Sequence, residues 1–239
     1  MSLVRTLNEI EYPESDGLPM GETDLHRNWM MRLFDMLRYR YRDQRVYVAC
    51  DLLVYYEEGE PSRFVVPDDF VVLDCEPGDR RVFKIWEEGK PPNVVIEVTS
   101  RTTKNEDTSH KPVLYARMGV RELFLYDPTS EYMTCPLQGF RLEGEEYLPI
   151  QPDPAGRLEC RELGLQLRLE HGQLVLRDSR TGEPLLTEGE AERAGREAER
   201  AARMAEQAAR EAAEARAAAA EEEVRRLREQ LKRQGGNQP

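Results

Sequence analysis

A glutamate inside an otherwise apolar segment is the first residue of this sequence that could do chemistry. Glu97 lies in the run VVIEVT at residues 94–99, which has the composition of a short buried strand. Side chains alternate between the two faces of a strand, so Glu97 shares its face with Val95 and Thr99. Burying a charge is costly unless the charge is paired or binds a metal ion. Glu97 is therefore a candidate site residue, unless the segment is an edge strand that leaves it in water.

A second carboxylate, Asp68, follows Pro67 and opens a strand predicted at residues 68–74. An aspartate at the start of a strand is common by itself. Two carboxylates on adjacent strands, however, can hold one or two Mg²⁺ ions, which prefer oxygen ligands and keep several waters. Such an ion activates water and neutralises charge at a phosphodiester, and a nearby lysine would stabilise the charge that develops. Together, Asp68 and Glu97 form a candidate Mg²⁺ site of a kind that can act at a phosphodiester.

Hydrophobic spacing and turn residues predict the elements that position these side chains. Apolar residues recur three and four apart in a helix over residues 24–41, which Asp24 can cap. A second helix covers about 111–118 and ends at Gly119, a residue suited to the left-handed conformation. Strands are predicted at residues 46–49, 52–56, 64–66, 68–74, 81–86, 94–99 and 122–126, and hairpins within 132–187.

The order of these elements predicts the fold class. Strands precede the helix at 111–118, a near-continuous apolar strand stands directly before it, and another strand follows it. This order is typical of a mixed sheet with a crossover. We therefore expect an α/β (mixed α+β) fold, a sheet flanked by helices with extra hairpins and a long C-terminal helix.

The C-terminal part of the chain has a different composition. Residues 188–233 contain 12 Glu, 11 Lys or Arg and 15 Ala, with alanines spaced alternately three and four apart from Ala191 to Ala219. This spacing predicts a heptad seam, either in a coiled coil or in a single solvated helix. Because the 239 residues exceed the usual ~150 per domain only moderately, we expect one domain at 1–187 and a helical tail at 188–239.

Composition excludes several classes of protein. Of the net charge of −12, the tail carries about −1, so the remainder carries −11, which argues against sequence-blind nucleic-acid binding through bulk charge. This net charge remains compatible with nucleic-acid binding through a local basic patch or through a metal-bridged phosphate. No apolar run approaches the ~18 residues that span a bilayer. The four cysteines form no C-x-x-C pair and the N-terminus does not resemble a signal peptide, so we expect a cytoplasmic protein.

Several motifs together resemble a known family. They are Pro67-Asp68, the segments 97–100 and 119–128, Lys111, and the shorter pieces 21–26, 86–90 and 137–140. In this order they resemble the PD-(D/E)XK nuclease superfamily and, more closely, the Uma-two family of restriction endonuclease-like proteins. The resemblance covers about residues 10–185, and an Ala/Glu/Arg-rich tail is a common appendage of that family.

The resemblance implies roles for individual residues. Asp68 and Glu97 match the two acidic motifs and would be metal ligands for Mg²⁺, with Mn²⁺ as an alternative, while Glu22 matches an auxiliary acidic residue. The superfamily usually has a lysine two residues after the glutamate, where this chain has Thr99. In this family the matching lysine is Lys111. The implied function is a Mg²⁺-dependent DNA endonuclease that works as a homodimer, since cutting both strands requires two active sites.

One departure leaves alternatives open. Pro112 follows Lys111, and a residue before proline resists helical geometry, so the helix is expected to begin near Pro112 with Lys111 at its start. Lys104 and Lys84 are alternative catalytic lysines. A catalytically degenerate nuclease fold that binds or assembles through its tail is the second hypothesis. The third hypothesis is a structural coiled-coil protein whose globular part only caps the coil. Such a globular part would need no buried carboxylates such as Glu97.

Overall fold

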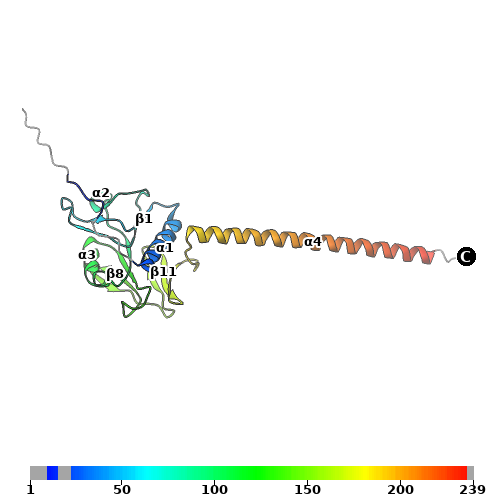
Figure 1. Cartoon of the computed structure of the whole chain (residues 1–239). Coiled ribbons are helices and arrows are strands. Elements are labelled where there is room, and N and C mark those ends of the chain that lie inside the picture. Colours follow the sequence, from blue (N-terminus) through cyan, green and yellow to red (C-terminus); the bar gives the residue numbers. More distant parts are fainter. Residues whose placement is uncertain (1–9, 16–22, 236–239) are drawn as a thin grey trace, which may run out of the picture. The chain divides into compact units, whose positions relative to one another are not determined.

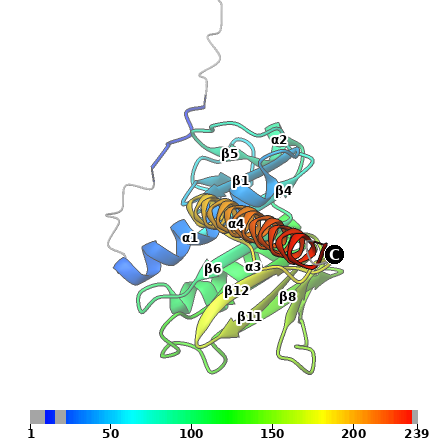
Figure 2. The same cartoon turned by 90° about the vertical axis from the view of Figure 1, so that its right-hand side faces the viewer.

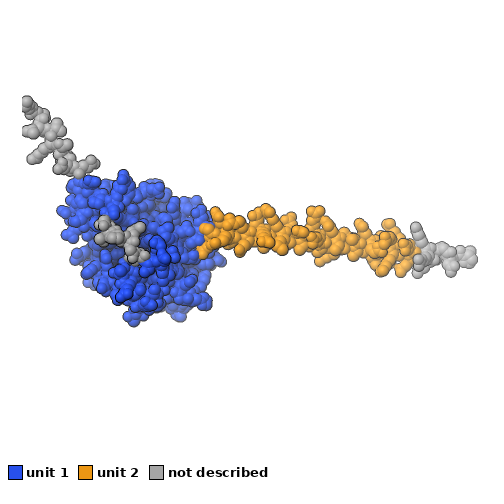
Figure 3. Space-filling view, viewed as in Figure 1, with its two compact units in different colours: residues 1–188 blue, residues 189–239 orange. Residues whose placement is uncertain are grey.

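The structure, a computed structural model, describes residues 10–15 and 23–235. The chain divides into two compact units, residues 1–188 and residues 189–239 (Figure 3). The first unit contains both hydrophobic cores and all of the described candidate site residues. Helix α4 (Glu188–Gly235) accounts for the described part of the second unit, and its residues up to 230 are almost all exposed.

A six-stranded mixed sheet forms the centre of the first unit (Figure 1). Its order is β1-β4-β6-β7-β8-β9, with β1 at Val46–Cys50, β4 at Asp69–Leu73, β6 at Val94–Val98, β7 at Glu122–Tyr126, β8 at Leu137–Glu143 and β9 at Glu146–Pro149. The parallel pair of neighbours in this sheet is β6 and β7, and helix α3 (Lys111–Met118) lies between them in the chain. Parallel neighbours need such a crossover. The predicted mixed sheet with a crossover is confirmed.

Two helices cover opposite faces of this sheet, α1 on the side that faces the viewer in Figure 2 and α3 on the other side, as Figure 1 shows. Helix α1 (Asp24–Tyr41) packs Trp29 and Leu33 into the core on one face, together with Ile96 of β6. Tyr115 of α3 packs into the core on the other face with Val95 of β6. Strand β6 is therefore buried on both faces, which explains its continuous apolar sequence and excludes the solvent-exposed edge strand considered for Glu97.

Two smaller sheets complete the first unit. One contains β2 (Val54–Tyr55), β3 (Phe64–Val65) and β5 (Phe83–Lys84), and the other contains β10 (Leu158–Cys160), β11 (Leu165–Glu170) and β12 (Gln173–Asp178). The expected hairpins are present as β8–β9 and β10–β11–β12. Of the strand expected at 81–86, only Phe83–Lys84 forms, since residues 81–82 are a bend and the chain turns into the short helix α2 (Ile85–Glu88). That helix ends at Gly89 with φ +76°, a value that glycine adopts without strain.

The helix that carries Lys111 begins earlier than expected. Helical residues run from 104 to 118, with the π-helical turn η1 (Glu106–His110) directly before α3. The Ser100 and Thr103 side chains each bond the other residue's backbone N–H, at 3.3 and 3.1 Å, which caps the start. The π turn widens the helix just before Pro112, whose ring would otherwise clash with the preceding turn. The predicted α-helix over 111–118 is therefore present as α3, but helical structure continues before it through η1, so Lys111 does not stand at a helix entry as expected.

No helix among the described residues is long and apolar enough to cross a membrane.

Candidate active site

The site forms where strands β4 and β6 separate. Their ladder ends at the pair Asp69–Ile96, one residue before Asp68 and Glu97 would face each other. Beyond that point the Asp68 side chain replaces the missing main-chain acceptor, since the Val98 N–H donates to Asp68 Oδ2 at 2.7 Å. The Asp68 N–H in turn donates to Glu97 Oε2 at 3.4 Å. The end of the ladder thus brings the two acidic motifs into direct contact.

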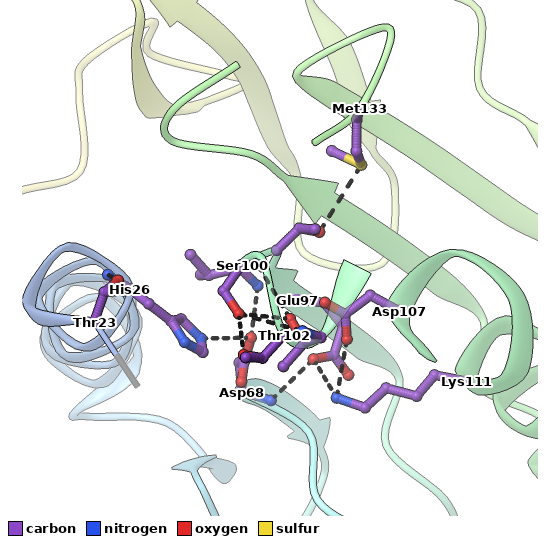
Figure 4. A network of polar contacts seen from close by, with 12 residues as sticks. Thr23, His26, Asp68, Glu97, Ser100, Thr102, Asp107, Lys111 and Met133 are labelled. Atoms are coloured by element: carbon purple, nitrogen blue, oxygen red, sulfur yellow. Dashed lines mark hydrogen bonds and ion pairs between the residues drawn. The ribbon is translucent and has the colours of Figure 1, made fainter. Parts of the chain in front are cut away.

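Glu97 is completely buried and receives donors from α3. The Lys111 ammonium lies 2.8 Å from Glu97 Oε2, and the Tyr115 hydroxyl donates to Oε1. Lys111 also lies 3.2 Å from a carboxylate oxygen of Asp107, which is buried as well. Figure 4 shows Lys111 and Asp107 approaching Glu97 from one side, while His26 of α1 approaches Asp68 from the other. Asp68, Glu97 and Lys111, predicted from three separate motifs, lie together.

A helical stripe supplies three of these groups. Asp107, Lys111 and Tyr115 are four residues apart, and residues at this spacing share one face of a helix. The stripe extends from α3 back past Pro112 to Asp107 because the π turn η1 keeps the chain helical there. In this turn the Lys111 N–H donates to the Glu106 carbonyl, five residues earlier. The family motifs did not identify Asp107 and Tyr115 as site residues, although their spacing from Lys111 was the available signal.

The site holds several carboxyl groups but one lysine ammonium, and burial together with this imbalance shifts the pKa values of all of them. Burial would lower the pKa of Lys111, but Glu97, Asp68 and Asp107 outweigh burial and hold that pKa above its ordinary value. Burial raises the pKa of Glu97 to about 8; Lys111 opposes this rise, while Asp68 and Asp107 add to it. Burial also raises the pKa of Asp107. Burial by itself would raise the pKa of Asp68, but the His26 hydrogen bond and the Lys111 charge hold this pKa below its ordinary value.

Charge balance indicates which ligand this donor set fits. With His26 neutral and all carboxyl groups ionised, Asp68, Glu97 and Asp107 contribute −3 and Lys111 contributes +1, a net charge of −2. A divalent cation would neutralise it. Among the residues that the structure describes, no three or more His, Cys, Asp and Glu side chains form a ready-made metal cage. Mg²⁺ is commonly held by one or two carboxylates with several waters, so Asp68 and Glu97 fit this ion.

The remaining sequence candidates lie elsewhere or outside the described residues. Glu22 falls in the segment 16–22, which the structure does not describe. Lys84 pairs with Glu87 at 3.0 Å and lies over the Tyr12 ring, so it is not the lysine on Glu97. Lys104 lies in the same helix as Lys111, but within the described part of the chain its ammonium makes no ion pair.

Asp69 is an unexpected feature beside the site. It is fully buried, and neither carboxyl oxygen has a hydrogen-bond partner among the described residues. Its register partners are Ile96 on one side and Cys50 on the other. Burial, with Asp68 and Glu97 nearby, raises the pKa of Asp69 well above its ordinary value, so the fold favours the protonated form of this carboxyl.

Replacing Asp69 with Val is expected to stabilise the fold by about 1–3 kcal/mol, since an unsatisfied buried polar group costs about that much and Val favours strands. The gain should grow as pH rises above about 4, because the unfolded chain then ionises Asp69 and the folded protein does not. Urea unfolding at pH 4 and pH 7 measures it, with Asp79→Val on the exposed surface as control. A destabilised Asp69→Val protein at pH 7 would contradict this account.

Comparisons with known proteins found a matching family and a similar solved structure. A crystal structure from Anabaena variabilis ATCC 29413, titled a "putative nuclease belonging to DUF820", is similar to the chain with 14% identity and a TM-score of 0.44. The similarity covers 60% of this chain and 75% of that one. Among curated proteins, none matches the chain. The family model Uma2, described as "Putative restriction endonuclease", matches residues 5–170. Because this match spans well over half of the 239 residues, the chain belongs to the Uma2 family.

Proposed function

We propose that this protein is a Mg²⁺-dependent endonuclease that hydrolyses phosphodiester bonds in DNA. The observation that carries the proposal is the convergence of Asp68, Glu97 and Lys111, which come from the start of β4, from β6 and from α3. A purely structural module has no need of two adjoining acidic residues and a buried lysine, since such groups are costly to bury. Membership of the Uma2 family supports the same reaction class.

Asp68 and Glu97 would hold the metal ion in this proposal. Asp68 is suited to that role because its side chain is 14% exposed and its pKa lies below the ordinary value, so it is ionised at neutral pH. Bound Mg²⁺, with Mn²⁺ as a substitute, would supply a Lewis acid that polarises the phosphodiester and lowers the pKa of a water molecule. Because Glu97 is partly protonated near pH 8, metal binding should release protons and strengthen as pH rises toward that value.

Lys111 would supply the positive charge at the reacting phosphate. Its pKa is raised above the ordinary value, so the ammonium is retained at neutral pH. A carboxylate oxygen of Asp107, four residues earlier on the same helical stripe, lies 3.2 Å from the ammonium and helps to hold it in place. A fixed ammonium in a buried site stabilises developing negative charge more strongly than one in water does. Lys111 thereby takes over the role that Thr99 cannot fill.

A plasmid-nicking assay tests the proposed reaction. Wild-type protein with Mg²⁺ or Mn²⁺ is expected to convert supercoiled plasmid to nicked and linear forms, and EDTA or Asp68→Asn should stop the conversion. Asp79→Asn, an exposed aspartate outside the site, serves as the matched control and should cut normally. No cutting by wild-type protein of single-stranded, double-stranded or supercoiled DNA would favour the degenerate fold that acts only in binding or assembly.

Mg²⁺ is expected to raise the melting temperature of the protein, because it binds only the folded state. At tenfold excess over Kd the stabilisation is about 1.4 kcal/mol, which corresponds to about 3–6 °C for a domain of this size. Differential scanning fluorimetry with and without Mg²⁺ measures the shift, and Asp68→Asn should abolish it. Equal shifts in wild type and Asp68→Asn would place the ion elsewhere.

We further propose a homodimer that forms through the first unit rather than through α4 alone. The alanine seam buries little area per residue, ~0.8 kcal/mol for each methyl group at best, against the entropy of ordering long charged side chains. A chain ending at Thr187 keeps Leu185, a buried residue of the larger core, and is expected to stay folded and dimeric. Light scattering beside the full-length protein decides this, and a folded monomer would assign dimerisation to the tail.

A further inference from the structure

A buried histidine contacts the candidate metal ligand from the far side of the site. His26 is 2% exposed and lies in the first turn of α1, where Thr23 Oγ1 accepts its backbone N–H at 3.3 Å. Its Nε2 lies 3.0 Å from Oδ2 of Asp68, a residue 42 positions away in the chain (Figure 4). The cap at Thr23 and the packing of α1 therefore fix the position of an imidazole nitrogen directly against Asp68.

The two oxygens of Asp68 have different surroundings. Oδ2 has two partners, His26 Nε2 and the Val98 N–H at 2.7 Å. Oδ1 has no hydrogen-bond partner within the described residues, yet it is not sealed from solvent, since the side chain remains 14% exposed. An ionised carboxylate can only accept hydrogen bonds, so the imidazole donates through Nε2. One oxygen is thus held by the protein and the other is left open.

We propose that His26 is a positioning residue that holds Asp68 Oδ2 and so presents Oδ1 as the metal ligand. This inference rests on the proposed metal-dependent function. The Val98 N–H alone would leave the carboxylate free to rotate about its Cβ–Cγ bond, and the second donor from α1 removes that freedom. Groups that hold a ligand in this way typically change metal affinity by 10–100-fold when they are removed.

His26 is a less suitable metal ligand itself. Its Nε2 is already engaged by Asp68, and Mg²⁺ prefers oxygen to nitrogen ligands. A purely structural histidine would make a different prediction, because its loss would lower stability without changing metal affinity in the protein that remains folded. Metal affinity therefore separates the two roles.

The test measures Mn²⁺ binding to the full chain by isothermal titration calorimetry. His26→Ala should weaken Mn²⁺ binding by about 10–100-fold. His26→Gln should recover most of the loss, because the glutamine amide nitrogen can occupy the place of Nε2 and donate to Asp68. His110→Ala is the matched control, since His110 is exposed in η1, and it should bind Mn²⁺ like the wild type. Melting temperatures in EDTA identify any variant that fails to fold.

Each outcome bears on a distinct claim. If His26→Ala folds and binds Mn²⁺ as tightly as the wild type, or if folded His26→Gln binds no better than His26→Ala, the positioning role is overturned. If His26→Ala does not fold, His26→Gln alone decides: near wild-type affinity supports the role, and a 10–100-fold loss overturns it. If wild type and Asp68→Asn both fail to bind Mn²⁺, the metal site fails and the inference falls with it.

Discussion

Replacing Glu97 with Gln is expected to reduce Mg²⁺-dependent DNA cleavage by about 1,000-fold while leaving the protein folded. The carboxylate is the charged ligand on β6, and its loss removes several kcal/mol of metal-derived stabilisation, or about 4 kcal/mol at 1.36 kcal/mol per tenfold in rate. The fold should survive because the glutamine carbonyl still accepts one hydrogen bond, from Lys111 or Tyr115. Lys111 also keeps Asp107 as a counter-charge.

Single-turnover cleavage rates and urea unfolding of the same preparations measure the two effects. Glu122→Gln is the matched control for losing a buried carboxylate, since Glu122 lies in the neighbouring strand β7 and pairs with Arg141 at 2.7 Å. That variant should lose stability, by about 1.5–3 kcal/mol for bonds to a charged group, yet cut at the wild-type rate when folded. Near wild-type cleavage by Glu97→Gln would remove Glu97 from the proposed metal site.

Replacing Lys111 with Met is expected to destabilise the metal-free protein by about 3–5 kcal/mol at pH 8, the usual cost of removing one partner of a buried ion pair. The ammonium pairs with both Glu97 and Asp107, so its loss leaves two buried carboxyl groups uncompensated. The same variant should lose cleavage activity, because the proposed charge at the phosphate is gone.

The destabilisation should shrink as the pH falls. The pKa of Glu97 is already raised to about 8 and that of Asp107 is raised as well, and without Lys111 both should rise further. The unfolded chain ionises these groups above about 4, so the folded state binds more protons and gains stability as pH falls from 8 toward 4. Urea unfolding at pH 5 and pH 8 measures this, with Lys104→Met in the same helix as control. A loss of equal size at both pH values would contradict the ion-pair account.

Much of the architecture follows from local patterns. The three-and-four spacing of apolar residues predicted the helix at 24–41, and the apolar run around Glu97 predicted a buried strand. The structure has α1 at Asp24–Tyr41 and β6 at Val94–Val98. Such patterns are reliable because one buried face imposes its period directly on the chain. The predicted cap of α1 was wrong by one residue: Thr23 and not Asp24 accepts the His26 N–H, since Asp24 is already the first residue of the helix.

Other features depend on interactions that have no local signal. The π turn accommodates Pro112, whereas the local rule for a residue before proline placed Lys111 at the start of the helix. The reciprocal hydrogen bonds of Ser100 and Thr103, which begin the helix earlier, use a pair without the usual Glu or Gln.

The sequence by itself determined which residues could do chemistry: a glutamate in an apolar strand, an aspartate at a strand start and, through the family resemblance, Lys111. Only the tertiary structure decided that they meet. The β4–β6 ladder stops at Asp69–Ile96, and His26 reaches Asp68 across 42 residues of chain. Strand register and the packing of helices on opposite faces set these contacts. They depend on the whole core, whereas sequence periodicity reports only which face of each element is buried.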